Sequence, residues 1–472
     1  GVTPREAAKR LGQHFGIAMH FEGPRRAPRK RRSVAGAPGH PPLTETGNAE
    51  RLILRHGQDI RYCSTWKKWL VWDGARWEVD ERCRIYGHAK EVVRSIAGEA
   101  EGLPEDEATP ILKFAEHSES CAAREAMVRL ARSEPKLVLV HRDLDVDAWL
   151  LNCRNGVLDL RTGELSPHRR EDLITKLAPV TYDATATCPR WLAFLERIMR
   201  DNADVIPFLQ RAVGYALTGD VSEQALFFLH GSGSNGKSTF TRVLQEMLGD
   251  YATQAAPDLL LAKQGEAHPT EITDLFGCRL AVCQEIEAGR SLAEVTVKQL
   301  TGGDLVKARR MREDFWFFAP THKLFIAANH KPVVRGTDNA IWRRIRLIPF
   351  LQTIADTERD PHLVEKLIEE RPGILRWAVE GCLAWQRHGL GEPEVVLAAT
   401  REYREEQDVV GEFIKDLCVV DAEVSVSARS LYETYTSWCE DNGHRPFKPN
   451  AFGARLRERG MAPNRGTKGA RR

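Results

Sequence analysis

A glycine-rich run near the middle of the chain has the residue types and spacing that bind a nucleoside triphosphate. It has the form G-x-x-x-x-G-K-S followed by a threonine, and its members are Gly231, Ser232, Gly233, Ser234, Asn235, Gly236, Lys237, Ser238 and Thr239. Glycines let successive backbone N–H groups face the phosphates at the N-terminus of a helix. Lys237 can then reach the β- and γ-phosphates, and the Ser238 hydroxyl can bind Mg²⁺.

Two apolar stretches are expected to form strands, one of which leads into the glycine-rich run while the other ends at an acidic residue. Residues 226–230 read as a buried parallel strand that leads directly into the run. Residues 279–284 read as a second strand that ends at Glu285, which can bind Mg²⁺ through water or polarise the attacking water. Glu287 is the reserve candidate for this role. Gln284 stands where many ATPases have a second carboxylate, which weakens the metal-binding side of the motif.

A third apolar stretch, 323–328, ends at Asn329, whose neutral amide can bond the γ-phosphate or the attacking water. Beyond it, Arg343 and Arg344 are candidates for a guanidinium that projects into a neighbouring subunit's site. Such a group contributes about 10³–10⁵ in rate, and it would make the enzyme active only as a ring. Surface arginines on a strand are the alternative, which fits Arg346 well and Arg344 less well.

The composition is that of a globular protein of several domains. The chain has 472 residues, of which 42% are hydrophobic and 28% charged, and its net charge is +2. Its ten cysteines lack metal-binding spacing and indicate reduced thiols in a reducing cytoplasm. No apolar run is long enough to cross a membrane, and no signal peptide is recognisable. We therefore expect a soluble intracellular protein.

The first 217 residues show organisation without obvious chemistry. Residues 1–43 are expected to hold a short helix and a flexible basic linker. The tryptophans of 62–78 surround an Asp-Gly turn and predict a hairpin. Helical periodicity covers 88–135 and 188–217. Between these helical regions, 150–164 reads as strands whose Asn and Asp side chains are expected to serve turns.

The C-terminal region predicts helices over 408–417, 428–439 and 450–459. The last two, with a tight turn and a basic second helix, outline a winged helix-turn-helix. Arg455 and Arg459 are then candidates for DNA groove binding, and a solvated helix face is the alternative.

The order of these elements resembles the superfamily 3 helicases, and most closely the C-terminal part of the phage and plasmid primase-helicases, akin to the poxvirus-type primase-helicase. The resemblance runs from about Thr44 to Gly460. It rests on 152–160, the glycine-rich run with its Asn235, the L-T-G-G-D of 300–304 before a basic hairpin, the N-H-K-P of 329–332 and the Arg343-Arg344 pair.

The resemblance implies an α/β fold with an AAA+-like P-loop ATPase core, an α+β N-terminal region and a C-terminal winged helix. The implied boundaries are 1–43 for the linker segment, 44–190 for a pre-helicase domain, 191–390 for the ATPase and 391–472 for the winged helix with its basic tail. By the same resemblance, Lys237 and Ser238 bind ATP and Mg²⁺, Glu285 is the Walker B acid, Asn329 is sensor 1 and Arg344 is the finger.

Members of this family form hexameric rings, move 3′ to 5′ on single-stranded DNA and open duplex at origins or forks. The resemblance thus implies a replicative helicase of a phage, virus or mobile element, in the cytoplasm of a bacterial host or virus-infected cell. Any primase domain would lie upstream of Gly1. In the basic hairpin, Lys307, Arg310 and Arg312 would track DNA phosphates, and one aromatic of 315–318 could rest on a base. Phe317 and Phe318 are expected in the core.

Two other functions stay open: a catalytically weak ring scaffold that binds DNA or an origin, and a P-loop phosphotransferase. No separate acceptor-binding domain is apparent, which argues against the phosphotransferase. Basic tracts at 23–32 and 455–472 offset an acidic remainder, so the near-neutral total excludes only a uniformly basic surface.

Overall fold

The computed structural model describes residues 36–37, 39–262, 271–309, 314–336, 339–421 and 424–461, which fold into two compact units. Unit 1 holds the chain up to Gln58 together with Arg82–Leu137, and unit 2 holds Asp59–Glu81 and the chain from Val138 onward. This division differs from the predicted boundary near residue 190, because the strands between 138 and 190 share a unit with the glycine-rich run. The predicted N-terminal helix and most of the basic linker lie outside the described residues.

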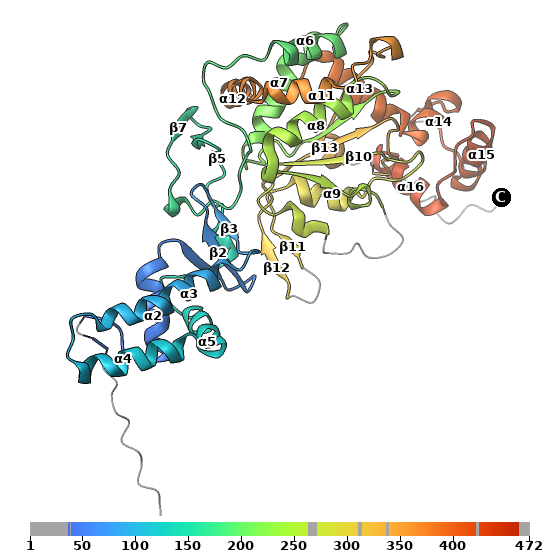
Figure 1. Cartoon of the computed structure of the whole chain (residues 1–472). Coiled ribbons are helices and arrows are strands. Elements are labelled where there is room, and N and C mark those ends of the chain that lie inside the picture. Colours follow the sequence, from blue (N-terminus) through green and yellow to red (C-terminus); the bar gives the residue numbers. More distant parts are fainter. Residues whose placement is uncertain are drawn as a thin grey trace, which may run out of the picture. The chain divides into compact units, whose positions relative to one another are not determined.

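Unit 1 is helical, as the periodicity of 88–135 predicts. Its helices are α2 (Glu45–His56), α3 (Arg84–Ser95), α4 (Glu105–Ser118) and α5 (Cys121–Ala131), with a 3-10 turn at Ile96–Ala100 (Figure 1). The hydroxyl of Thr44 accepts from the Gly47 N–H and caps the start of α2. Arg51 and Glu99 form a buried ion pair, with Nε and Oε1 2.6 Å apart. In the described part of the chain, no helix of either unit is long and apolar enough to span a bilayer.

Unit 2 opens with two small sheets. One has the order β3-β2-β1-β4 and the other β5-β6-β7. Their strands are β1 (Ile60–Cys63), β2 (Lys68–Trp72), β3 (Trp77–Val79), β4 (Val138–Leu139), β5 (Leu150–Cys153), β6 (Gly156–Asp159) and β7 (Glu164–Ser166). The predicted tryptophan-rich hairpin is confirmed, because β2 and β3 pair antiparallel with Trp72 opposite Trp77.

The expectation that Asn152 serves a turn is wrong. Asn152 is fully buried in β5, and its Nδ2 donates to the carbonyl oxygens of Ala75 and Lys176, each at 3.0 Å. Its side chain therefore links the second small sheet to the turn that joins β2 and β3. A buried amide needs such partners, since an unsatisfied one costs free energy.

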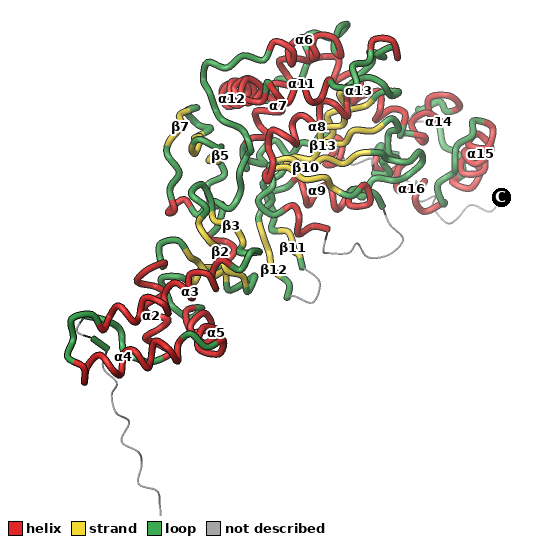
Figure 2. The backbone as a smooth tube through the Cα atoms, in the orientation of Figure 1, coloured by secondary structure: helices red, strands yellow, loops and turns green. Residues whose placement is uncertain are grey.

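The centre of unit 2 is a five-stranded parallel sheet of order β14-β8-β13-β10-β9 (Figure 2). Its strands are β8 (Leu226–His230), β9 (Ala252–Ala255), β10 (Leu280–Gln284), β13 (Lys323–Ala328) and β14 (Ile345–Pro349). The expected strands over 226–230, 279–284 and 323–328 are thus confirmed to within one residue. This parallel sheet agrees with the α/β core expected of a P-loop protein.

Alternating side chains of the sheet pack into two cores. Phe227 and Leu229 face a core that they share with α6, α7, α8 and α12, whereas Phe228 faces a second core that includes α9. Figure 1 shows α7 and α12 on one side of the strands and α9 on the other. The helices of this part are α6 (Pro189–Ile198), α7 (Val205–Leu217), α8 (Lys237–Leu248), α9 (Glu294–Thr301), α10 (Asn339–Trp342), α11 (Leu363–Glu369), α12 (Arg371–His388) and α13 (Glu394–Glu406). Because both faces of the sheet are buried, each strand needs apolar residues on both sides, and its sequence is therefore a continuous hydrophobic run.

Three further helices end the described chain: α14 (Val409–Leu417), α15 (Ala428–Asp441) and α16 (Pro449–Glu458). They pack around Phe413, Tyr435, Trp438 and Phe452. The predicted helices are therefore present, each within two residues of its predicted bounds. No strand that would serve as the wing occurs among the described residues after β14, so the winged form stays a prediction.

Candidate nucleotide-binding site

The glycine-rich run forms a tight loop between β8 and α8, as its sequence predicts. Gly233 and Gly236 have φ angles of 108° and 85°, which are strained for other residues. At Gly231 a Cβ would lie 2.2 Å from the carbonyl oxygen of Phe350, so only glycine fits there. α8 begins at Lys237, and its first turn carries the exposed Ser238. The loop therefore has the open backbone and helix N-terminus that fit bound phosphates and Mg²⁺.

Lys237 is held over this loop by three oxygen acceptors. Its Nζ donates to the carbonyl oxygen of Gly231 and to Asn235 Oδ1, each at 2.8 Å, and to Asn329 Oδ1 at 3.1 Å. Burial lowers the pKa of Lys237 to about 8. The ammonium is thus already oriented, and a bound phosphate would favour its charged form.

Asn235 joins the loop to the strand beside it. Its Oδ1 accepts from Lys237, and its Nδ2 donates to the Phe350 carbonyl at 3.0 Å. The side chain is buried, so both ends of the amide are used. Asn235 therefore fixes Lys237 relative to the end of β14.

The position of Asn329 follows from the strand order. β13 lies directly beside β8, and Ala328 is opposite His230 in the parallel register. The residue after each strand, Asn329 and Gly231, therefore emerges at the same edge of the sheet. A Cβ on Gly233 would lie 3.9 Å from Asn329 Nδ2, which places this amide at the loop. Asn329 and Lys237 are thus brought together as the sequence predicts.

Glu285 lies one strand farther away. β10 pairs with β13 and not with β8, and Glu285 follows its last residue in a left-handed conformation with φ 60°. Glu285 is exposed, which leaves its carboxylate accessible to water and to Mg²⁺. The reserve candidate Glu287 pairs with Arg290 at 3.4 Å. Gln284 donates from Nε2 to Thr241 Oγ1 at 3.2 Å and thereby braces β10 against α8.

The surroundings of Arg344 do not fit the role of a projecting finger. Its guanidinium is 7% exposed and donates to Thr301 Oγ1, the Ala340 carbonyl and Gln224 Oε1, at 3.1, 2.6 and 3.1 Å. Arg343 is exposed and also donates to Gln224, at 2.7 Å. To enter another subunit's site, Arg344 would have to give up its buried bonds. The geometry therefore favours Arg343 over the predicted Arg344.

A further arginine at the loop has no counterpart in the sequence predictions. Arg359 donates to the hydroxyl of Ser234 and pairs with Asp356 at 2.9 Å. The chain before it is also tied to the loop, since the Ile354 N–H donates to the Ser234 carbonyl at 2.7 Å. Arg359 places a second positive charge beside the loop. No motif marks it, and only its proximity in the fold reveals it.

The predicted basic hairpin exists as β11 (Val306–Ala308) and β12 (Trp316–Phe318), which pair antiparallel. Lys307 is exposed opposite Phe317, and its Nζ lies 4.2 Å from the ring centroid of Phe315. Arg310 and Arg312 lie outside the described residues. Phe318 is buried as expected, but Phe317 is 50% exposed, so the expectation that it belongs to the core is wrong. The alternation along β12 puts Trp316 and Phe318 inside and Phe317 outside.

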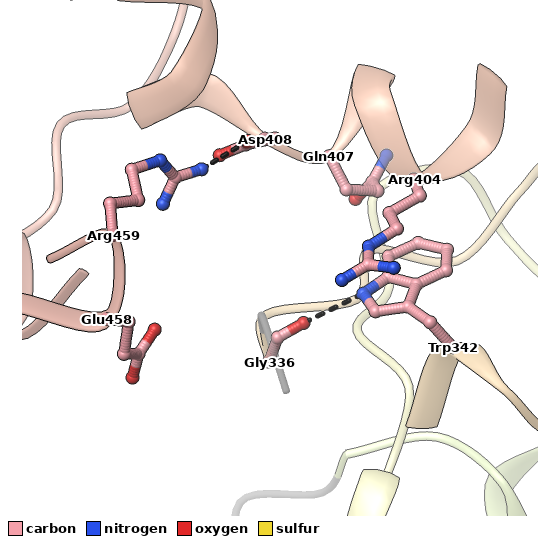
Figure 3. Close-up of a pocket in the computed structure, with 7 residues that line it drawn as sticks. All are labelled: Gly336, Trp342, Arg404, Gln407, Asp408, Glu458 and Arg459. Atoms are coloured by element: carbon pink, nitrogen blue, oxygen red, sulfur yellow. Dashed lines mark hydrogen bonds and ion pairs between the residues drawn. The ribbon is translucent and has the colours of Figure 1, made fainter. Parts of the chain in front are cut away.

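The predicted role of Arg455 in DNA groove binding is also wrong for this conformation. Arg455 is 8% exposed, stacks over Phe447 at 4.1 Å and donates to the Arg335 carbonyl. Arg459 forms an ion pair with Asp408 at a cavity of about 480 Å³ (Figure 3). The two arginines therefore stabilise the packing of α16 against its neighbours. Their spacing on the helix could not reveal that this face is covered.

Three segments of the chain match known protein families. Residues 49–200 match the family described as D5 N terminal like, and residues 405–460 match the family described as Poxvirus D5 protein-like. Over these two segments the chain is similar to D5-like proteins. Between them, residues 229–344 match DUF5906, a family of unknown function, and this segment contains Lys237, Glu285 and Asn329.

Viral proteins are similar to this chain over roughly half to two thirds of its length. A protein of Acanthamoeba polyphaga mimivirus named "Putative helicase" is 29% identical over 326 residues, which cover 64% of this chain and 34% of that protein. One of Frog virus 3, also named "Putative helicase", is 26% identical over 53% of this chain and 28% of that protein. One of African swine fever virus named "Putative primase" is 23% identical over 63% of this chain and 33% of that protein. The chain thus spans about a third of the length of these relatives.

Among solved structures, the C-terminal region of NrS-1 matches with a TM-score of 0.36 and 11% identity, over 66% of this chain and 76% of that chain. At this level the likeness carries no argument about the fold or function of the chain.

Proposed function

We propose that this chain is the ATP-driven motor part of a replicative DNA helicase that assembles as a ring. The observation that carries the proposal is the bond between Lys237 and Asn329, which joins the phosphate loop to the end of the neighbouring strand. An amide at this point can detect the γ-phosphate without adding negative charge beside it. A nucleotide-dependent change there would be passed on by the chain that follows Asn329.

That following chain is tied to α13. Lys331 pairs with Glu406 at 2.6 Å, the Tyr403 hydroxyl donates to the Pro332 carbonyl, and the Val334 N–H donates to Gln407 Oε1 at 3.1 Å. Tyr403 is 1% exposed, so this connection lies in the packed interior. A shift of Asn329 on hydrolysis would therefore move α13, which continues toward α14. This is the kind of coupling that a motor needs and a simple phosphotransferase does not.

Bound ATP with Mg²⁺ would supply the γ-phosphoryl group, and its transfer to water would drive the motor. Lys237 binds the β- and γ-phosphates in this proposal, and the Ser238 hydroxyl with Glu285 holds Mg²⁺. Glu285 also polarises the attacking water, and Asn329 orients it. Arg343, from the adjacent subunit, neutralises charge in the transition state, so hydrolysis depends on the ring.

The hairpin β11–β12 is the proposed contact with single-stranded DNA. Lys307 and Phe317 are opposite each other on its exposed face, which combines a positive charge with an aromatic ring. Phosphate attraction and base stacking on such a surface do not depend on sequence. Strand β12 is held in place, because His141 Nε2 lies 2.9 Å from the Phe317 carbonyl oxygen. Hexameric assembly, 3′ to 5′ movement and forked DNA as substrate are carried over from the family resemblance.

One observation favours a second candidate, a catalytically weak ring scaffold that binds DNA. Gln284 replaces an acid next to Glu285, and its amide is engaged by Thr241. This arrangement removes one negative group that would hold Mg²⁺, so ATP binding without hydrolysis is the signature of this alternative.

ATP hydrolysis by the full chain, measured with and without single-stranded DNA, separates the candidate functions. The helicase proposal predicts hydrolysis that single-stranded DNA stimulates. A scaffold would bind ATP and DNA with neither hydrolysis nor stimulation. A phosphotransferase would consume ATP only when a small acceptor is added.

A further inference from the structure

Two histidines and a glutamate come together in unit 1, on α2 and α3. His56 is the last residue of α2, and His88 and Glu91 lie three residues apart on one face of α3. Each of the three offers one ligand atom, and all of these atoms lie within 4.8 Å of one another. α2 and α3 pack against each other within this unit (Figure 1). The three side chains therefore meet where the two helices are joined.

The distances are close to those of a metal site. His56 Nε2 lies 3.5 Å from Glu91 Oε2, and the two imidazole rings are stacked with centroids 4.2 Å apart. Around a tetrahedral Zn²⁺ with ligand bonds of roughly 2.0–2.1 Å, ligand atoms are separated by roughly 3.3–3.5 Å. Because the stacked rings hold their in-plane lone pairs side by side, the proposal requires the imidazoles to rotate out of the stack so that both face one ion.

The electrostatics of the cluster also favour a cation. Nδ1 of His88 is buried and has no hydrogen-bond partner among the described residues, which costs free energy in the folded chain. His56 stands at the C-terminus of α2, where the helix dipole is negative, and Glu91 adds a carboxylate. Two neutral imidazoles with a carboxylate are donors that suit Zn²⁺ and related divalent transition metals.

We propose that His56, His88 and Glu91 bind one divalent transition metal ion, with Zn²⁺ as the preferred occupant. Three protein ligands leave a fourth position for water. The ion would join the end of α2 to the middle of α3 and thereby stabilise unit 1. This site is separate from the nucleotide chemistry and does not rest on the proposed function. The competing explanation is a stacked histidine pair closed by an ion pair, with no metal.

The test uses the full chain, stripped with a chelator and then titrated with Co²⁺ and Zn²⁺ alone under reducing conditions. We expect one equivalent of Co²⁺ with visible d–d absorption and without the near-ultraviolet thiolate band that cysteine ligands would produce. Zn²⁺ should displace it and raise the thermal unfolding midpoint.

Three variants decide between the explanations. His88→Gln and Glu91→Gln should each weaken metal binding at least about tenfold and abolish the rise in midpoint. Glu91 has a side chain that is 61% exposed, so its replacement leaves the fold intact even if His88→Gln disturbs it. His117→Gln, on an exposed histidine of α4, is the matched control and should bind like the unaltered chain. Equal binding by the Glu91 and His117 variants, or no binding by the unaltered chain, would overturn the proposal.

Discussion

Lys237 Nζ lies 3.1 Å from Asn329 Oδ1, so the cation of the phosphate loop is bonded to an amide 92 positions later in the chain. The contact exists because β13 is inserted between β8 and β10. The two groups that would detect the γ-phosphate are therefore in contact before any phosphate is bound. In the proposed coupling, ATP binding rearranges this bond as the first step.

Replacement of Asn329 should separate hydrolysis from binding. Asn329→Ala removes the amide that orients the attacking water in the proposed mechanism, and we expect hydrolysis to fall by about 10²–10³ while nucleotide affinity changes only a few-fold. Asn329→Asp should weaken binding as well, since it adds a negative charge beside the phosphates. Steady-state hydrolysis and the fluorescence of a labelled ATP analogue measure the two effects, with Asn442→Ala as a distant control. Normal hydrolysis by Asn329→Ala would show that this amide has no catalytic role.

Nucleotide affinity should depend on pH through Lys237. Burial lowers the pKa of Lys237 to about 8, and bound phosphates must raise this pKa. Binding therefore takes up a proton above pH 8, and the affinity should decline by up to about tenfold per pH unit there. At about pH 7 and below the lysine is largely charged, and its contribution should be nearly constant there. Titrations of a labelled ATP analogue up to about pH 9.5 measure this decline.

The control for the pH effect is Lys237→Arg, because its guanidinium stays charged over the whole range. Any residual binding by this variant should lack the decline above pH 8. An affinity of the unaltered chain that is constant through pH 9 would contradict the assignment.

The two adjacent arginines should behave differently. Arg344→Ala removes a buried guanidinium with three bonds, and we expect the free energy of unfolding to fall by about 1–3 kcal/mol. Arg343→Ala should change stability by no more than about 0.5 kcal/mol but reduce hydrolysis by the assembled protein by about 10³. Thermal unfolding and hydrolysis at concentrations that favour assembly measure both. A stable Arg344→Ala variant without hydrolysis would restore the original assignment to Arg344.

The exposed face of the hairpin should determine affinity for single-stranded DNA. Phe317→Ala removes a stacking surface worth about 1–3 kcal/mol per base, and Lys307→Ala removes a phosphate contact. We expect both variants to need more DNA for stimulation, and Lys307→Ala to show a weaker salt dependence. Leu305→Ala is the matched control, since Leu305 is exposed on the segment entering the hairpin. Equal losses in all three variants would indicate a general distortion of the hairpin.

The sequence predicted the individual segments of this site, but it did not predict which of these segments contact one another in the fold. Spacing alone located the glycine loop, and apolar runs located the strands before Glu285 and Asn329. Periodicity cannot state which strands are adjacent, so it could not show that Asn329 is nearer to Lys237 than Glu285 is. The same limit explains Arg455, whose helix face is covered by chain far away in sequence, and Arg359, which reaches Ser234 from a loop without a motif.

Strand displacement by the unaltered chain and by Lys237→Ala tests the central claim most directly. A forked DNA with a single-stranded tail and ATP should be unwound by the unaltered chain and not by the variant. Retained DNA binding and an unchanged thermal midpoint in Lys237→Ala would show that only the motor has been lost. Equal displacement by the two proteins would contradict the proposal that ATP bound at this loop drives unwinding.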